Sequence, residues 1–221
     1  MTLSCISSEK KTKGRKPTMG KMNLLKANWE GKVGQTVGAK WKNRSTIRTY
    51  TKPSNPKTAA QMSVRTAFAA MTSYVALFAD QIKYLSALNT SGQSVRNAII
   101  QANKMQIQDG TFDKATLIVS KGGLQKVSGE MAEAATNKVK VTWTNPTATN
   151  FTDKAKLVAV MVQEESGLVD VVTEDAKKGA TGVTSNIDFV TGTVDVFVYF
   201  LDVRGSSKVA SISDYLTATI A

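Results

Sequence analysis

The chain has 221 residues, 42% of them hydrophobic, which is enough to form a sizeable core. It has no histidine and one cysteine, Cys5, which excludes an internal disulfide and every catalytic arrangement that needs histidine. No run of about 18 apolar residues is present, so no membrane-spanning helix is expected, and residues 1–16 lack the apolar run of a signal peptide.

The net charge of +12 is concentrated at the N-terminal end. Residues 1–65 contain 15 Lys and Arg against two Glu, a net of +13, whereas residues 66–221 contain 14 Lys and Arg against 15 Asp and Glu, a net of −1. This asymmetry favours contact of the basic third with a polyanion or an acidic partner, and a solubilising tail is the alternative interpretation.

Residues 1–21 are predicted to form a basic, disordered arm, because so few apolar side chains cannot offset the entropy cost of ordering. Met19 and Met22 leave open whether translation begins at Met1 or at one of these later positions. The basic residues that we expect the arm to use for docking are Lys10, Lys11, Lys13, Arg15 and Lys16.

Residues 22–110 are predicted to form a β-ribbon followed by two helices. The ribbon spans residues 32–50, with β-branched and aromatic residues on both sides of a polar turn at residues 42–44. Its glycines resemble a phosphate-binding loop only superficially, because no Gly-Lys-Ser/Thr follows them. Basic residues interleaved with aromatics suit contact with nucleic acid or with a neighbouring subunit. The candidate docking residues of the ribbon are Lys40, Trp41, Lys42, Arg44 and Arg48.

The first helix is expected to start at Asn55-Pro56, since Asn is a favoured N-cap and Pro a favoured first helical residue. Apolar residues then recur at spacings of three and four up to Phe78, which is typical of an amphipathic helix. Their usual meaning is a core-facing stripe, and a partner-binding face is the alternative. A second helix is predicted over residues 94–105, and Asp109-Gly110 ends the region with a turn.

Residues 111–221 change to a period of two and are predicted to form an antiparallel, immunoglobulin-like β-sandwich. Two of the strands are apolar on both faces, so they are expected to be central or to carry subunit contacts. The whole chain is thus predicted to be α+β. The predicted strands are residues 115–120, 138–144, 156–163, 168–173, 194–201 and 208–220.

The carboxylates of the chain are not arranged for chemistry. Glu164-Glu165 and Glu174-Asp175 lie near predicted turns, where solvated charges are expected. Asp195 and Asp202 border one strand and are spaced so that they face opposite sides. We therefore expect no catalytic residues, no cofactor, no metal site and no small-molecule substrate.

Three segments together resemble a known group of sequences. They are Gly31-Lys32-Val33-Gly34-Gln35-Thr36-Val37-Gly38, the stretch from Trp41-Lys42 to Arg48, and Pro53-Ser54-Asn55-Pro56-Lys57-Thr58-Ala59-Ala60-Gln61 with Val64-Arg65 and Phe68. They resemble a family of uncharacterised phage, prophage and Bacteroidetes-type proteins that pair a GKVG-x-x-VG ribbon with a PSNPKTxxQ helix start. Members often carry an immunoglobulin-like or fibronectin-like domain after it. The resemblance covers roughly residues 29–80, implies a virion component, and does not extend to residues 1–21.

The sequence therefore leads to the hypothesis of a non-catalytic structural component of a bacteriophage virion, in the capsid, connector or tail. Such a chain would be made in the bacterial host's cytoplasm and would bind other virion proteins, as a homo-oligomer or in a symmetric assembly, without a membrane. The alternative is a nucleic-acid-binding module acting through its basic third, with DNA as the partner. A carbohydrate-binding surface domain rests on the predicted sandwich alone.

Overall fold

The computed structural model describes residues 21–23, 28–41, 44–52, 54–55, 57–88, 92–148, 150–179, 181–205 and 207–221. The chain divides into two compact units, residues 1–56 and residues 57–221.

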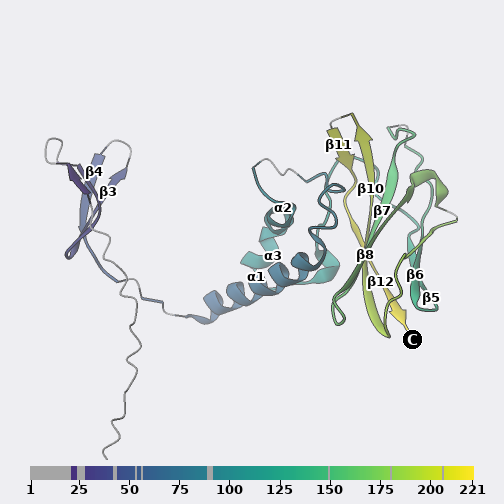
Figure 1. Cartoon of the computed structure of the whole chain (residues 1–221), viewed down its shortest axis with the longest axis horizontal. Coiled ribbons are helices and arrows are strands. Elements are labelled where there is room, and N and C mark those ends of the chain that lie inside the picture. The colour runs from purple at the N-terminus through teal and green to yellow at the C-terminus, as the bar shows by residue number, and fades with distance from the viewer. Residues whose placement is uncertain are drawn as a thin grey trace, which may run out of the picture. The chain divides into compact units, whose positions relative to one another are not determined.

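The first unit is an antiparallel meander with strand order β1-β2-β3-β4 (Figure 1). A two-residue turn joins β2 to β3, and Gly34 in this turn has a φ of +57°, which glycine adopts readily. The predicted ribbon is confirmed as part of this larger sheet, and the predicted arm lies outside the described residues except for Lys21. The strands are β1 (Lys21–Asn23), β2 (Asn28–Val33), β3 (Thr36–Trp41) and β4 (Arg44–Thr49).

The second unit begins with helix α1 (Ala59–Phe78), which starts later than the sequence predicts. Thr58 is the N-cap, and its hydroxyl accepts a hydrogen bond from the backbone N–H of Gln61 at 3.4 Å. The prediction of Asn55 as the cap is wrong. Lys57 has a φ of +46°, in the left-handed region, so Lys57 is not helical and α1 begins after it.

The predicted second helix is divided at Asn103 into α2 (Val95–Ala102) and α3 (Lys104–Gln108). The Asn103 side chain is buried, and its Nδ2 donates to the carbonyl oxygens of Ile99 at 2.8 Å and Ile118 at 2.9 Å. Its Oδ1 accepts from the N–H of Ile118 at 2.8 Å. The amide therefore forms hydrogen bonds with both the N–H and the carbonyl oxygen of Ile118, as a neighbouring strand would.

The predicted strand over residues 115–120 is consequently wrong. Residues Lys114–Thr116 form a short 3₁₀ turn, η1, and the segment after it bonds to side chains. Besides the Asn103 contacts, the N–H of Val119 donates to the Ser213 hydroxyl at 2.9 Å. Apolar alternation alone does not distinguish such a segment from a strand. The difference is that its backbone partners are the side chains of Asn103 and Ser213, which lie far away in the sequence.

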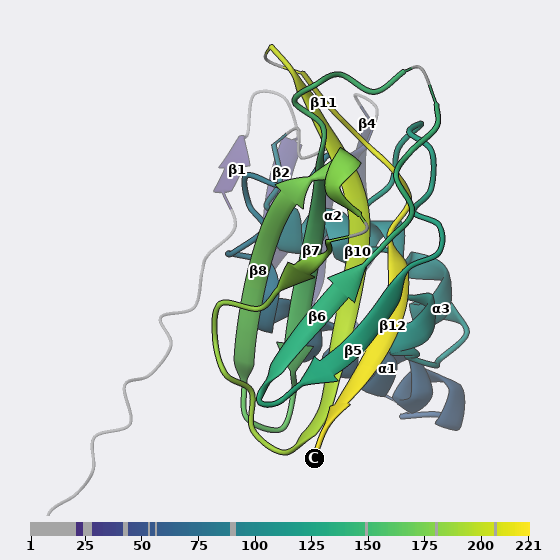
Figure 2. The same ribbon diagram turned by 90° about the vertical axis from the view of Figure 1, so that its right-hand side faces the viewer.

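Two antiparallel sheets form the rest of the unit, so the predicted α+β class with a C-terminal β-sandwich is confirmed (Figure 2). The larger sheet has the order β11-β10-β7-β8, with β12 also paired to β10, and the smaller has the order β5-β6-β9. A 3₁₀ turn, η2 (Ala176–Lys178), follows β8. The strands are β5 (Met131–Ala135), β6 (Lys138–Thr142), β7 (Lys156–Gln163), β8 (Leu168–Asp175), β9 (Val183–Thr184), β10 (Gly192–Arg204), β11 (Ser207–Ala210) and β12 (Asp214–Ile220).

Strands β7 and β10 are central and bury both faces, one toward the smaller sheet and one toward the helices (Figure 2). On β10, Val196 and Val198 belong to the core between the sheets, whereas Phe197 and Tyr199 belong to the core beneath the helices. This is the period of two expected of a strand covered on both sides. Of the two roles predicted for the doubly apolar strands, the central one applies.

The helices and the sandwich therefore share a core. Met71, Tyr74 and Phe78 of α1 pack with Phe197 and Tyr199 of β10. The boundary predicted at residue 110 does not separate two cores, because the apolar stripe of α1 is buried on the sheet and the compact unit begins at residue 57.

Replacing Phe78 by Ala is expected to lower the free energy of unfolding by about 3–5 kcal/mol. The ring is fully buried and packs against Tyr74 and Phe197. Met62→Ala is the matched control, because Met62 lies on the same helix and is 44% exposed, and we expect a change within about 0.5 kcal/mol. Urea unfolding followed by circular dichroism measures both variants. Equal, small losses would contradict the packing of α1 on the sheet.

Candidate functional site

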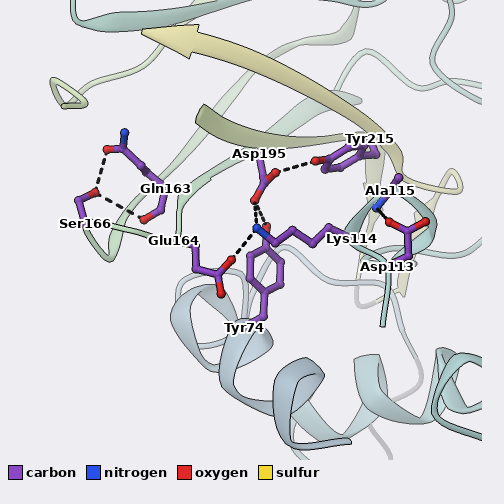
Figure 3. A network of polar contacts seen from close by, with 9 residues as sticks. All are labelled: Tyr74, Asp113, Lys114, Ala115, Gln163, Glu164, Ser166, Asp195 and Tyr215. Carbon is purple, nitrogen blue, oxygen red and sulfur yellow. Dashed lines mark hydrogen bonds and ion pairs between the residues drawn. The ribbon is translucent and has the colours of Figure 1, made fainter. Parts of the chain in front are cut away.

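A buried carboxylate on β10 joins the helices to the larger sheet (Figure 3). Asp195 is 4% exposed, and its Oδ2 accepts hydrogen bonds from the hydroxyl of Tyr74 at 2.9 Å and from Lys114 Nζ at 3.0 Å. Its Oδ1 accepts from the hydroxyl of Tyr215 at 2.6 Å. Lys114 also forms an ion pair with Glu164 Oε2 at 2.5 Å. The cluster thus connects α1, η1, the β7–β8 turn, β10 and β12.

The protonation of these groups is fixed by their surroundings. Burial, and then the neighbouring Asp195 carboxylate, raise the pKa of Tyr74 above its ordinary value, so the hydroxyl keeps its proton. Burial and the hydrogen bond to Asp195 raise the pKa of Tyr215 in the same way. Burial alone would lower the pKa of Lys114, but its bonds to Glu164 and Asp195 outweigh this and raise it. Both tyrosines act as donors and Lys114 stays charged.

This arrangement holds the fold together and leaves little room for a reacting molecule. Both carboxylate oxygens of Asp195 are engaged by protein donors. Four cavities found among the described residues are lined by other side chains. A general base needs contact with a substrate proton, and Asp195 is enclosed by its own partners.

Asp202, at the far end of β10, faces the opposite side of the strand, as the spacing predicts. It is fully buried, and its Oδ2 accepts from the N–H of Thr152 at 3.1 Å and from Arg204 Nε at 2.9 Å. Burial would raise the pKa of Asp202, but the bonds from Thr152 and Arg204 outweigh it and lower the pKa. Asp202 therefore anchors the loop that precedes β7.

The adjacent acidic pairs lie where the sequence places them, at the ends of strands. Glu164 and Glu165 occupy the β7–β8 turn. Glu174 and Asp175 are the last two residues of β8, and Glu174 Oε1 accepts from Lys178 Nζ at 3.1 Å. Within the described ranges, no group of three or more potential metal ligands is found.

The candidate docking residues fall into two groups. Lys10, Lys11, Lys13, Arg15, Lys16 and Lys42 lie outside the described residues. Trp41 and Arg44 are paired in register across β3 and β4. Lys40 and Arg48 are exposed, but the register places them on opposite faces of the meander, since Lys40 pairs with Ser45 and Arg48 with Val37. The ribbon residues therefore do not form one surface.

One face of the meander does gather basic and aromatic side chains, and it includes Lys32, which was not among the candidate docking residues. Lys32 and Arg48 are both paired with Val37, so they lie on the same face on either side of it. Lys32 Nζ lies 3.7 Å from the centre of the Tyr50 ring, a cation–π contact. Tyr50 extends the ladder through its N–H, which donates to the carbonyl of Gln35 at 2.6 Å. A period of two places Arg48 and Tyr50 on one face. The two-residue turn at Gly34 pairs Lys32 with Val37 and so places Lys32 on that face as well.

A second exposed surface lies on the first half of α1. Val64 and Phe68 continue, at spacings of three and four, the stripe that includes Met71, Val75 and Phe78. Those three are buried, whereas Val64 is 36% and Phe68 47% exposed. Figure 1 shows this half of the helix extending away from the sandwich. The exposed apolar stripe of α1, meaning Ala60, Val64 and Phe68, is therefore not covered within the described residues.

The first half of α1 is nonetheless held in place by the end of α3. The Ser63 hydroxyl donates to the carbonyl oxygen of Gly110 at 2.9 Å. A Cβ on Gly110 would lie 2.0 Å from the Ser63 hydroxyl oxygen, and Gly110 has a φ of +71°, so only glycine fits. The exposed stripe is thus presented on an anchored helix.

Residues 27–217 match a protein family of unknown function, DUF6266. The chain belongs to this family. The match includes both compact units, from β2 to β12, and leaves the predicted basic arm outside it. None of the curated proteins matches the chain in sequence. Among the described residues of this DUF6266 protein, no helix is long and apolar enough to cross a membrane.

The replacement Tyr74→Phe is expected to lower the free energy of unfolding by about 1.5–3 kcal/mol, because it removes a hydrogen bond to a buried charged group and keeps the ring. Tyr84→Phe is the matched control, since Tyr84 is 75% exposed, and it should be neutral. Combining Tyr74→Phe with Asp195→Asn in a double-mutant cycle isolates the coupling between the two residues. A coupling free energy near zero would contradict the role of Asp195 in joining α1 to the larger sheet.

Stability is also expected to fall as pH rises above about 10. The ordinary tyrosine pKa is 10.0, and the folded chain holds the pKa of Tyr74 above it. Above this pH the unfolded chain loses the hydroxyl proton while the folded chain keeps it, so stability decreases by about 1.4 kcal/mol per pH unit for each such group. Urea titrations between about pH 8 and pH 11 should show a shallower slope for Tyr74→Phe than for Tyr84→Phe. Equal slopes would exclude this contribution.

Proposed function

We propose that this DUF6266 protein is a non-catalytic structural subunit of a bacteriophage particle, which assembles through surfaces that its own fold leaves uncovered. The observation that carries the proposal is the exposed apolar stripe of α1 on an anchored helix. The virion as its location rests on the resemblance of the ribbon and helix-start segments to phage and prophage sequences.

The stripe supports assembly because burying its side chains is favourable and the described chain does not do so. Exposed Val64 and Phe68 lie one turn apart on the same face of α1. Arg65 is the only charged residue of the helix, so a partner meets little desolvation cost there. Fully burying a Val or Phe side chain contributes about 1.5–3 kcal/mol each, which is enough to drive association.

The meander of the first unit supports the same proposal. Its described side chains are mostly exposed, including Ile47 at 64% and Tyr50 at 42%. Exposed apolar and aromatic residues on a sheet this small favour a surface that another chain covers.

The proposal includes the absence of catalysis, which the hydrogen bonding of the two buried carboxylates supports. Asp195 and Asp202 are both held by neighbouring donors of the fold. Carboxylates that are hydrogen-bonded in this way stabilise the structure, and a reaction would require them to give up these donors.

Nucleic-acid binding is the second candidate, and the basic face of the meander favours it. Residues 1–56 contain 13 Lys and Arg against two Glu, a net of +11. Lys32, Arg48 and Tyr50 provide cations beside an aromatic ring, which suits phosphates and bases together. Such binding would weaken steeply with salt.

The assembly proposal predicts a discrete oligomer of the full chain in size-exclusion chromatography with light scattering. Val64→Glu combined with Phe68→Glu should raise the dissociation constant at least about a hundredfold, because two carboxylates would be buried in the contact. Thr66→Glu with Ala70→Glu is the matched control, with the same spacing and charge on exposed positions away from the stripe. It should assemble as the wild type does.

A wild-type chain that stays monomeric, and that mass spectrometry does not find in purified phage particles, would contradict the proposal. A monomer that shifts only when DNA is added, reverts at high salt and loses the shift in Lys32→Glu with Arg48→Glu would instead establish the second candidate. The same chromatography run with and without DNA distinguishes the two.

A further inference from the structure

Beyond the edge of the helices, the larger sheet carries a cleft of about 500 Å³. Its floor is apolar and formed by Val158 of β7 with Leu201 and Val203 of β10, and its wall is formed by Tyr84 and Leu85. Small-molecule sites commonly have volumes of about 300–1,000 Å³ and mainly apolar walls, and this cleft has both properties.

The wall of the cleft is fixed to the sheet by two hydrogen bonds. The Tyr199 hydroxyl donates to the carbonyl oxygen of Leu85 at 3.1 Å. Lys208 Nζ donates to the carbonyl oxygen of Tyr84 at 2.6 Å. The cleft is therefore preformed, and a ligand entering it would not have to order the segment above the sheet.

Lysines stand on both sides of the apolar floor. Lys156 is paired in register with Leu201, and Lys208 with Val203, so all four lie on the same side of the sheet. Lys154 completes the rim.

The charge around the cleft is only partly neutralised. Asp153, the acidic residue of the lining, forms an ion pair with Lys177 at 2.6 Å. Asp175 is paired in register with Lys156, and its Oδ1 accepts from the N–H of Lys177 at 2.9 Å. Among the ion pairs formed by described residues, none includes Lys154 or Lys156.

We propose that this cleft binds a small apolar anion, a carboxylate joined to an aliphatic or aromatic body. The body lies over Val203 and against Tyr84 and Leu85. The carboxylate meets the ammonium groups of Lys154 and Lys156 at the rim. This site is independent of the exposed apolar stripe of α1, which lies on another element.

The probe for the test is anilinonaphthalene sulfonate, an aromatic anion whose fluorescence rises in apolar surroundings. We expect saturable binding at one competitive site per chain. Decanoate should displace the probe, and decanol, which has the same body without the charge, should need at least about a tenfold higher concentration. Equal competition by decanoate and decanol would overturn the anion selectivity.

Two variants locate the site. Lys154→Glu with Lys156→Glu should weaken binding of the probe and of decanoate at least about tenfold, because it reverses the charge at the rim. Lys57→Glu with Lys104→Glu, two exposed lysines elsewhere, is the matched control and should bind normally. Val203→Glu should also abolish binding, whereas Val190→Glu, at a valine 52% exposed outside the cleft, should not.

Thermal unfolding of each variant establishes that a loss of binding is not a loss of fold. Absence of saturable binding to the wild type, or equal binding by the cleft variants and their controls, would overturn the proposal. Because the assembly state is measured separately, this failure is distinguishable from a failure of the virion proposal.

Discussion

Strands β7 and β10 bury side chains on both faces, and the other elements of residues 57–221 are arranged around that requirement. An apolar strand face left in water costs about 25 cal/mol per Å², so each face needs its own cover. The smaller sheet covers one face, where Val196 and Val198 point, and α1 covers the other, over Phe197 and Tyr199. The sandwich and the helices are therefore interdependent layers of a single body.

Asp195 sits where these layers meet, and it gives the packing a defined orientation. Apolar contact between α1 and the sheet is nondirectional, whereas the bonds from Tyr74, Lys114 and Tyr215 fix positions to within a hydrogen-bond length. The cost of burying the carboxylate is offset because three donors meet it and Lys114 balances its charge. The helix can thus dock on the sheet in one register.

The α+β class, the main strands and the stripe of α1 could be predicted because each follows from a local period. The three-layer packing could not, since the doubly apolar strands of residues 111–221 indicate that both faces need a cover, and nothing local indicates which element supplies it. Asn103 shows the limit most clearly, because its amide replaces a strand partner for Ile118, 15 positions away in sequence. The same holds for the bond between Tyr74 and Asp195, and for the cleft, which brings together Tyr84, Lys154 and Leu201.

The order of the elements along the chain has a consequence for synthesis on the ribosome. Tyr74 and Asp195 are 121 residues apart, and at typical rates of synthesis the second emerges on the order of ten seconds after the first. Until β7 emerges, Met71, Val75 and Phe78 have no strand on which to pack, and β10 follows later. The apolar stripe of the nascent helix stays accessible during this time, and chaperones at the exit tunnel can bind it. Only the C-terminal strands β10, β11 and β12 complete the core that covers it.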